Sequence, residues 1–321
     1  MRKKIAVLLL LFLAGLFFIT VILYPQTDRG QKFLRIHKPV SNKTLLIEGW
    51  IPYREIRHVK RIIDNAGYNK VIISGKKLPD WLKIYQEASL IYTSSYEYKT
   101  VNKIKVSVRA RGTPADNVYP AIIIRCNNQK SDSLFVEPKY NYYSWEFNAE
   151  DSCTHLSVDF VNDAYNRFED RNLFINQVIV NEDTLLPRQD GFVLSSFSNK
   201  VSETASNRGD LLGNYLQHMG VNKAAILSFE MPEPNSLSKT MHYARRNTHW
   251  LKENGYNSVD VYMPGIHSRR TFYSYKKFED RSFKVGITSP EHNINRWARW
   301  YHRSYEMLRL MVVIITPSWL L

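Results

Sequence analysis

The sequence is poor in cysteine and lacks the common catalytic and nucleotide-binding motifs. Its 321 residues include only two cysteines, Cys126 and Cys153, which are too few for a disulfide scaffold or a cysteine-ligated metal. In an oxidising compartment the two could pair, and a disulfide and two free thiols both stay open. The chain has no G-x-G-x-x-G, Walker, H-E-x-x-H or G-x-S-x-G motif, which removes the familiar dinucleotide, P-loop, zinc-protease and hydrolase signatures. Low-complexity tracts and obvious internal repeats are also absent, and 44% hydrophobic residues are typical of a folded protein.

Charged residues are absent from a run of nineteen apolar or small residues, 5–23, which follows Arg2, Lys3 and Lys4. At 1.5 Å per residue this run would span roughly 28 Å, about the thickness of a bilayer core. We therefore predict an N-terminal transmembrane helix in residues 1–24, with the basic cluster cytoplasmic. The chain would then be a single-pass inner-membrane protein with its bulk on the periplasmic side. A cleaved secretory signal is the alternative.

The net charge of +14 would suit nucleic acid, anionic lipid or an acidic polymer. The predicted anchor excludes most nucleic-acid functions, so we predict no nucleic-acid partner. Because the basic residues are scattered along the chain, a solvated surface beside an anionic membrane explains most of the charge.

Two separated parts of the chain alternate between strand and helix patterns. Short apolar runs at 44–47 and 71–73 flank a helical pattern that ends at Gly67. The same rhythm returns after about residue 200, with strands predicted at 224–229, 259–263 and 284–287. This alternation predicts a parallel sheet with helices on both faces.

Between these parts the pattern changes to strands alone. Residues 103–109 alternate with period two, and further short β runs follow, separated by turn residues. We predict an all-β sandwich inserted into the α/β domain. The predicted fold class is α/β, and the predicted domains are a membrane anchor at 1–24, the first α/β part at 40–90, the inserted sandwich at 91–188 and the second α/β part at 200–321.

One loop of the insertion, 162–172, carries six acidic or amide side chains between two apolar strands. Hard cations need clustered carboxylate and carbonyl oxygens, although an acidic turn held by its own side-chain hydrogen bonds would look the same. The run Phe160-Val161-Asn162-Asp163, followed by Asp170-Arg171-Asn172-Leu173 and then by residues 175–181, resembles the signature of calcium-dependent xylan-binding carbohydrate-binding modules.

That resemblance implies a calcium cofactor and a polysaccharide or envelope-glycan partner. It points to Asp163 and Asp170 as metal ligands, with Glu169 supplying a backbone carbonyl. The candidate sugar-stacking rings are Trp145, Tyr165 and Phe168, and the alternative for each ring is a place in the core.

In the α/β parts, each predicted strand ends on residues capable of chemistry. Ligands of parallel α/β sheets bind at the carboxyl ends of the strands. The residues found there are Glu48, Ser74, Glu230, Glu233, His267, Arg269, Arg270, Thr288 and Ser289. The segment 265–271 opens a helix directly after a strand, which suits a phosphate or carboxylate. The alternative is that His267 caps this helix and that both arginines are solvated.

Several segments resemble the bacterial envelope family of YdcF, SanA and ElyC, which has a Rossmann-like domain. They are 46–50 with Pro52, 73–75, Lys239-Thr240, Trp250-Leu251, 265–271, and 297–300 followed by a helix through Tyr305-Glu306. Carried over by position, the resemblance implies a pocket lined by Glu48, Ser74, Lys239, Thr240, His267 and Arg270. No cofactor is evident for this domain.

Together these features predict an envelope protein that binds polysaccharide through calcium and an anionic group in the α/β pocket. If the protein is an enzyme, Glu48 or Glu233 with His267 would be the acid and base, and Arg269 and Arg270 would stabilise negative charge. A non-catalytic factor in which both domains only bind is the alternative. A domain active on a soluble nucleotide-like ligand, with the insertion as a spacer, is a third hypothesis.

Overall fold

The computed structural model describes residues 15–40, 43–51, 55–84, 87–93, 103–148, 153–166, 169–196, 199–202, 204–233, 239–290 and 300–316. The chain forms two compact units. Met1–Lys76 and Val221–Leu321 make up the first, here called the α/β unit, and Lys77–Gly220 make up the second, the sandwich unit.

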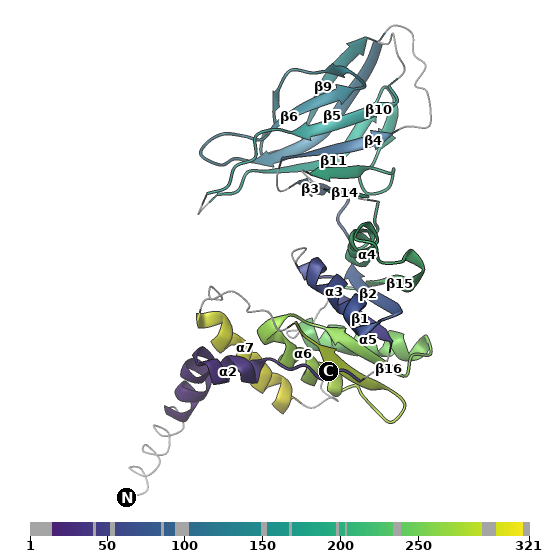
Figure 1. Ribbon diagram of the computed structural model, residues 1–321. Helices are drawn as coiled ribbons and strands as arrows, with labels where there is room; N and C mark the ends of the chain where they lie inside the picture. Colours follow the sequence, from purple (N-terminus) through teal and green to yellow (C-terminus); the bar gives the residue numbers. More distant parts are fainter. Residues whose placement is uncertain are drawn as a thin grey trace, which may run out of the picture. The chain divides into compact units, whose positions relative to one another are not determined.

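The α/β unit is built on a five-stranded sheet in which all neighbouring strands are parallel (Figure 1). In sheet order the strands are β15 (Ile226–Met231), β2 (Lys70–Lys76), β1 (Thr44–Glu48), β16 (Ser258–Tyr262) and β17 (Lys284–Thr288). The chain runs outward from β1 to β15 and then continues on the other side of β1. The strand order therefore reverses between β1 and β16, where sheets of this kind bind ligands at their carboxyl edge.

Helices α5 (Lys239–Glu253) and α6 (Ser268–Lys276) cover one face of this sheet. These helices share a core with strands β1 and β2. The core is formed in part by Leu46, Ile72, Ala244, Leu251, Phe272 and Tyr275. Because side chains alternate along a strand, Leu45 and Ile47 are buried on the other face. Helix α3 (Ile56–Ala66) connects β1 to β2 and ends at Gly67, whose φ of 65° is the left-handed conformation that glycine adopts readily.

The N-terminal segment of the described chain is helical and leads into the strands of the α/β unit. It contains η1 (Phe18–Leu23), η2 (Tyr24–Gln26) and α2 (Asp28–Leu34). Thr27 caps α2 by accepting a hydrogen bond from Gly30 N at 3.0 Å. Leu34 of α2 packs with Met307 and Leu310 of α7 (Trp300–Ile315).

The sandwich unit contains two antiparallel sheets around one core (Figure 1). The first contains β14 (Asn199–Ser202), β13 (Val193–Ser196), β4 (Ala88–Thr93), β10 (His155–Phe160), β6 (Ala121–Cys126), β7 (Gln129–Lys130) and β8 (Leu134–Phe135). The second contains β12 (Asp183–Leu185), β11 (Asn172–Val180), β5 (Lys103–Thr113), β9 (Asn141–Asn148) and β3 (Leu82–Ile84). Helix α4 (Arg208–His218) completes the unit.

Strand β5 shows why the sequence folds in this way. Ile104, Val106, Val108 and Ala110 are fully buried, and the residues between them are at least partly exposed. The buried set faces apolar side chains of β6 and β10 in the same core. A disulfide between Cys126 and Cys153, both buried, closes a loop of 27 residues in this unit. The structure thus decides between the two states that the sequence left open for these cysteines.

The predicted fold class is corrected in two respects. The described chain is mostly β-sheet, with seventeen strands in three sheets beside its helices. Within the ranges given above, no helix combines the length and apolar character needed to cross a bilayer. Of the predicted transmembrane run, residues 5–14 lie outside the described residues, and 15–23 are helical, with α-helical geometry at 15–17 and a π-helix at Phe18–Leu23. This finding overturns the predicted transmembrane helix, the single-pass inner-membrane location and the membrane contact derived from it.

Candidate functional site

Glu48 ends β1, and the strand register determines the face of the sheet to which it points. β1 pairs with β2 so that Leu46 lies beside Ile72 and Glu48 beside Ser74. Leu46 and Ile72 belong to the core under α5 and α6. Glu48 and Ser74 lie two residues further along their strands, so they point to the same face.

The Glu48 carboxylate is 2% exposed and receives two hydrogen bonds. Tyr275 Oη donates to Oε1 at 2.7 Å, and Trp50 Nε1 donates to Oε2 at 2.6 Å. Asn247 Nδ2 donates in turn to Tyr275 Oη at 2.6 Å. Burial raises the pKa of Glu48, and the two hydrogen bonds and the charge of Arg270 offset this only in part. Glu48 is therefore a buried carboxyl group whose neutral form is favoured.

Arg270, Glu306 and His267 form a charge cluster next to this network. Arg270 Nε lies 2.7 Å from Glu306 Oε2, and Arg270 Nη1 donates to Thr240 Oγ1. His267 Nδ1 lies 3.1 Å from Glu306 Oε1. Burial alone would raise the pKa of Glu306, but His267 and then Arg270 outweigh it and lower the pKa to about 2. Glu306 is thus an ionised carboxylate held between the Arg270 guanidinium and the His267 ring.

Arg270 links the two groups of residues. Its positive charge acts on Glu48 as well as on Glu306. Glu48 and His267 therefore lie on the same side of the sheet, near the point where the strand order reverses. The guanidinium of Arg270 is buried and bonded to protein oxygens, so it supports its neighbours rather than presenting donors to solvent.

The other predicted pocket residues are placed differently. Arg269 donates from Nε to the Phe33 carbonyl and lies 4.4 Å over the Phe33 ring, so it contacts α2. Glu233 lies 3.0 Å from Lys76, and both side chains are exposed. Lys239 is exposed at the first residue of α5.

Ser74 is buried beside Glu48, and its carbonyl accepts a hydrogen bond from Gly49 N at 2.6 Å. Tyr243 of α5 connects this group with Glu233. Burial raises the pKa of Tyr243, and the charges of Glu233 and Glu48 raise it further. The predicted residues that the structure brings together are therefore Glu48, Ser74, Thr240, His267 and Arg270.

The charge cluster places a buried carboxylate beside the ring of His267. His267 Nδ1 is buried and lies 3.1 Å from Glu306 Oε1 without the alignment of a hydrogen bond, so Nε2 is the ring nitrogen left to exchange a proton with a ligand. The side chain of His267 is 37% exposed, whereas that of Glu306 is buried. A base held by a buried carboxylate is an arrangement suited to general acid–base catalysis.

Three residues of this site were not among those predicted for it, although Glu306 lies in a segment of the family resemblance. Asn247, Tyr275 and Glu306 come from α5, α6 and α7. Asn247 and Glu306 lie within their helices and Tyr275 is the penultimate residue of α6, so none of them follows a strand and the strand-end criterion does not find them. The buried position of Glu306 at 3% exposure becomes visible only when α7 is packed.

The acidic loop of the sandwich unit is organised by Arg171. This buried arginine donates to the carbonyls of Ala115, Asn162 and Val118 at 2.6, 2.5 and 2.8 Å. The Glu169 carboxylate accepts from Asp116 N at 2.7 Å, and its carbonyl accepts from Asn166 N at 2.9 Å. Part of the loop is therefore held by its own hydrogen bonds, and Glu169 is engaged through both its carboxylate and its carbonyl.

Two oxygens of the same loop lack such partners. Asp163 Oδ1 and Asn172 Oδ1 are buried, and within the described part of the chain neither accepts a hydrogen bond. Burial raises the pKa of Asp163, and the nearby charges of Asp170 and Glu87 raise it further. Buried acceptors next to a second carboxylate are groups that a cation would satisfy. Among the described residues, no group of three or more His, Cys, Asp or Glu side chains is arranged to hold a metal.

The predicted sugar-stacking rings differ in exposure. Tyr165 is 78% exposed and forms an isolated bridge with Asp170. Trp145 is only partly buried but packs against the sandwich core. Phe168 lies outside the described residues. Tyr165 is therefore the ring best placed for a ligand at the acidic loop.

Comparison with known families supports a carbohydrate-binding role for this unit. Residues 105–195 match the family model CBM60, described as a Ca-dependent carbohydrate-binding module, xylan-binding. The matched segment includes the acidic loop and supports binding of a xylan-like polysaccharide. The comparisons do not show the predicted resemblance to YdcF, SanA and ElyC.

A solved structure of a family two carbohydrate esterase from Cellvibrio japonicus is 10% identical to the chain. The alignment covers 75% of this chain and 93% of the esterase chain, with a TM-score of 0.24. A similarity of this size supports no inference about fold or activity. The curated proteins that were compared with the chain contain no match.

Proposed function

We propose that the sandwich unit binds a xylan-like polysaccharide through calcium held at the acidic loop. The observation that carries the proposal is the pair of buried, unpartnered acceptors, Asp163 Oδ1 and Asn172 Oδ1, in a segment that matches a calcium-dependent module. Calcium accepts amide, carbonyl and carboxylate oxygens together. Asp163, Asp170 and Asn172 would hold the ion, which supplies positive charge for sugar hydroxyls.

The exposed ring of Tyr165 supports the same proposal. Sugars pack their apolar faces on aromatic rings, and a ring that is 78% exposed next to Asp170 is available for such a contact. Trp145 contributes to the core instead.

Calcium dependence of glycan binding tests the proposal. We expect the full chain to bind xylan oligosaccharides in calcium and to lose this binding in a chelator, as measured by isothermal titration calorimetry. Asp163→Asn with Asp170→Asn should abolish the calcium-dependent part. The exposed Asp183 lies on β12 outside the loop, so Asp183→Asn is the matched control and should bind normally. Binding that is equal with and without calcium would refute the proposed role of the ion.

We also propose that the α/β unit binds an anionic group beside His267 and transfers a proton to or from it. The observation that favours this second function is the ionised Glu306 carboxylate 3.1 Å from His267 Nδ1. Glu48 lies too deeply buried to meet a ligand directly, and it supports Tyr275 and Trp50 through hydrogen bonds.

Turnover of glycans that carry carboxylate or phosphate groups tests this second function. We expect product release, followed by mass spectrometry, to fall by roughly two to four orders of magnitude in His267→Gln, the range for loss of a general acid or base. His218→Gln on α4 should retain the wild-type rate. Bound but unchanged glycan in the wild-type protein would favour the alternative in which both units only bind.

A further inference from the structure

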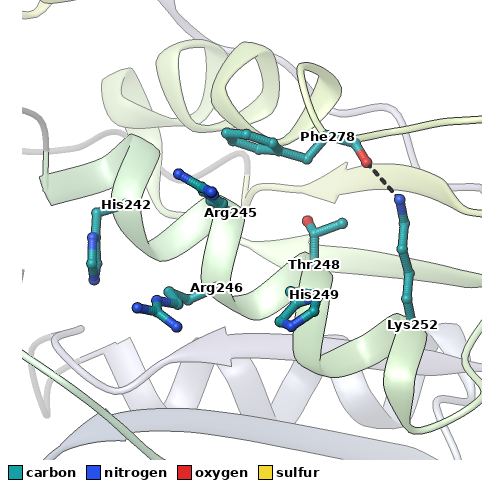
Figure 2. Close-up of a pocket in the computed structure, with 7 residues that line it drawn as sticks. All are labelled: His242, Arg245, Arg246, Thr248, His249, Lys252 and Phe278. Carbon is teal, nitrogen blue, oxygen red and sulfur yellow. Dashed lines mark hydrogen bonds between the residues drawn. The ribbon is translucent and has the colours of Figure 1, made fainter. Parts of the chain in front are cut away.

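A pocket on the outer side of α5 carries a concentration of positive charge away from the residues described above. Its volume is about 410 Å³, within the range of small-molecule sites. Five basic side chains line it: His242, Arg245, Arg246, His249 and Lys252. They follow the helix at intervals of three and four residues, which places them on neighbouring turns of one face (Figure 2).

Carboxylates pair with two of the five basic side chains. His249 Nε2 lies 3.1 Å from Glu253 Oε1, and Lys252 pairs with Asp280. Among the described residues, no carboxylate lies within ion-pair distance of Arg246. Like charges three or four residues apart on a helix repel one another, so the pocket is a place where an anion would be stabilised.

Thr248 gives an independent indication of a ligand. Its side chain lines the pocket and is 2% exposed. Its Oγ1 is buried and has no hydrogen-bond partner among the described residues. His242 is another lining residue, and its Nε2 is also buried and without a hydrogen-bond partner among the described residues. Buried polar atoms in native proteins are nearly always hydrogen-bonded, so two such atoms in one basic pocket require an explanation.

Phe278 adds an apolar wall. Its ring borders the pocket on the side of α6, while its carbonyl accepts a hydrogen bond from Lys252 Nζ at 3.0 Å (Figure 2). A bare inorganic anion would contact the arginines and leave this ring unused. A sugar ring that bears an oxyanion would use both walls.

We propose that this α5 pocket binds a sugar that carries a carboxylate or phosphate group. Arg245 and Arg246 hold the oxyanion, the Thr248 hydroxyl donates to it or to a neighbouring sugar oxygen, and Phe278 packs against the sugar. This site is separate from the two in the proposed function and does not depend on either of them.

Titration of the full chain with four probes tests the proposal: glucose 6-phosphate, glucuronate, inorganic phosphate and glucose. We expect at least one charged sugar to bind by calorimetry more tightly than inorganic phosphate, with no binding of glucose. The charged sugar that binds more tightly identifies the source of the oxyanion. Equal affinity for every anion would overturn the proposal, as would no binding of either charged sugar.

Paired variants locate the site. Arg245→Gln with Arg246→Gln should weaken binding by about tenfold or more, because charge-assisted hydrogen bonds are lost. Arg57→Gln with Arg61→Gln removes the same charge from exposed positions on α3 and should change binding less than twofold. Equal weakening by both pairs would mean unspecific attraction and would overturn the assignment.

The variant Thr248→Val tests whether the Thr248 hydroxyl binds the ligand or is simply a buried group without a hydrogen-bond partner. Valine has nearly the same shape, so the fold should be retained, as checked by circular dichroism. We expect affinity for the charged sugar to fall by about fivefold, the effect of one hydrogen bond. Unchanged affinity in a folded Thr248→Val protein would exclude the hydroxyl from the site and overturn the proposed geometry. The His267→Gln protein should bind the sugar in this pocket with wild-type affinity.

Discussion

Replacing Glu306 by glutamine should destabilise the α/β unit strongly while leaving its shape nearly unchanged. In the wild-type protein this carboxylate is 3% exposed, and it neutralises Arg270 and contacts His267. Glutamine keeps the size of the side chain but removes its charge. Arg270 would then remain buried without its counter-charge, which is the costly way of breaking a buried ion pair.

The magnitude follows from the pKa of Glu306. Its folded value of about 2 lies below the ordinary 4.5, and this difference corresponds to about 3 kcal/mol of stabilisation at neutral pH. Because the pKa is lowered on folding, the stabilisation is complete above about pH 4.5 and disappears as the pH falls through about 2. Breaking a buried pair costs about 3 to 5 kcal/mol, so we expect Glu306→Gln to cost about 3 kcal/mol or more at neutral pH.

Hydrogen exchange followed by mass spectrometry measures this cost within the unit concerned. The free energy of opening should fall in β1, α6 and α7 of the full-length variant, and it should be unchanged in the sandwich unit. Glu253→Gln is the matched control, because Glu253 pairs with His249 on the exposed side of α5. Exposed pairs contribute at most about 1 kcal/mol, so this control should remain near the wild-type value.

Two results would refute the reasoning about Glu306. The first is a cost below about 0.5 kcal/mol at neutral pH, since a surface ion pair has that magnitude. The second is a difference between wild type and Glu306→Gln that stays constant as the pH falls from about 5 to about 2. A constant difference would mean that the carboxylate acts through packing rather than through its charge.

Three further predictions concern other parts of the chain. The Cys126–Cys153 disulfide closes a loop of 27 residues, so its reduction should lower the stability of the sandwich unit by about 3.5 kcal/mol on the chain-entropy model. Urea unfolding with and without reductant measures this difference, and equal stability would contradict the prediction. Gly286→Ala should unfold or strongly destabilise the α/β unit, because a Cβ at this position would meet Asp260 Oδ1 at 1.9 Å. A melting temperature equal to that of the wild type would show that the neighbouring atoms move to relieve this contact. Tyr165→Ala should weaken xylan binding by about fivefold or more without changing stability, because stacking on one ring contributes about 1 kcal/mol or more. Equal affinity of the variant and the wild type by calorimetry would exclude the Tyr165 ring from the binding site.

Much of the local structure could be predicted from the sequence. The apolar run at 44–47 predicted a strand, and β1 spans Thr44–Glu48. Alternation in 103–109 predicted a strand within which the structure buries every second residue of β5. Such patterns are reliable because the period of a helix or strand is a property of the backbone itself.

The N-terminal run shows the limit of this approach. Its hydropathy predicted a membrane-spanning helix, whereas its described residues, 15–23, form a shorter helical stretch in which Val21 is buried and large side chains such as Phe18 and Ile19 are exposed. Hydropathy measures how apolar a segment is, but it does not determine how long a regular helix the segment forms.

The candidate sites likewise contain features that the sequence predicted and features that it could not predict. Sequence alone determined that Glu48, His267 and Arg270 would come near the carboxyl edge, because parallel strands bring their ends to one side of a sheet. Only the tertiary structure decided that Arg270 turns to Glu306, that Arg269 turns to Phe33, and that Asp163 and Asn172 keep unpartnered oxygens. Charge pairing and burial depend on which helices pack against each other, and residues distant in sequence, such as those of α7, supply partners that no local pattern contains.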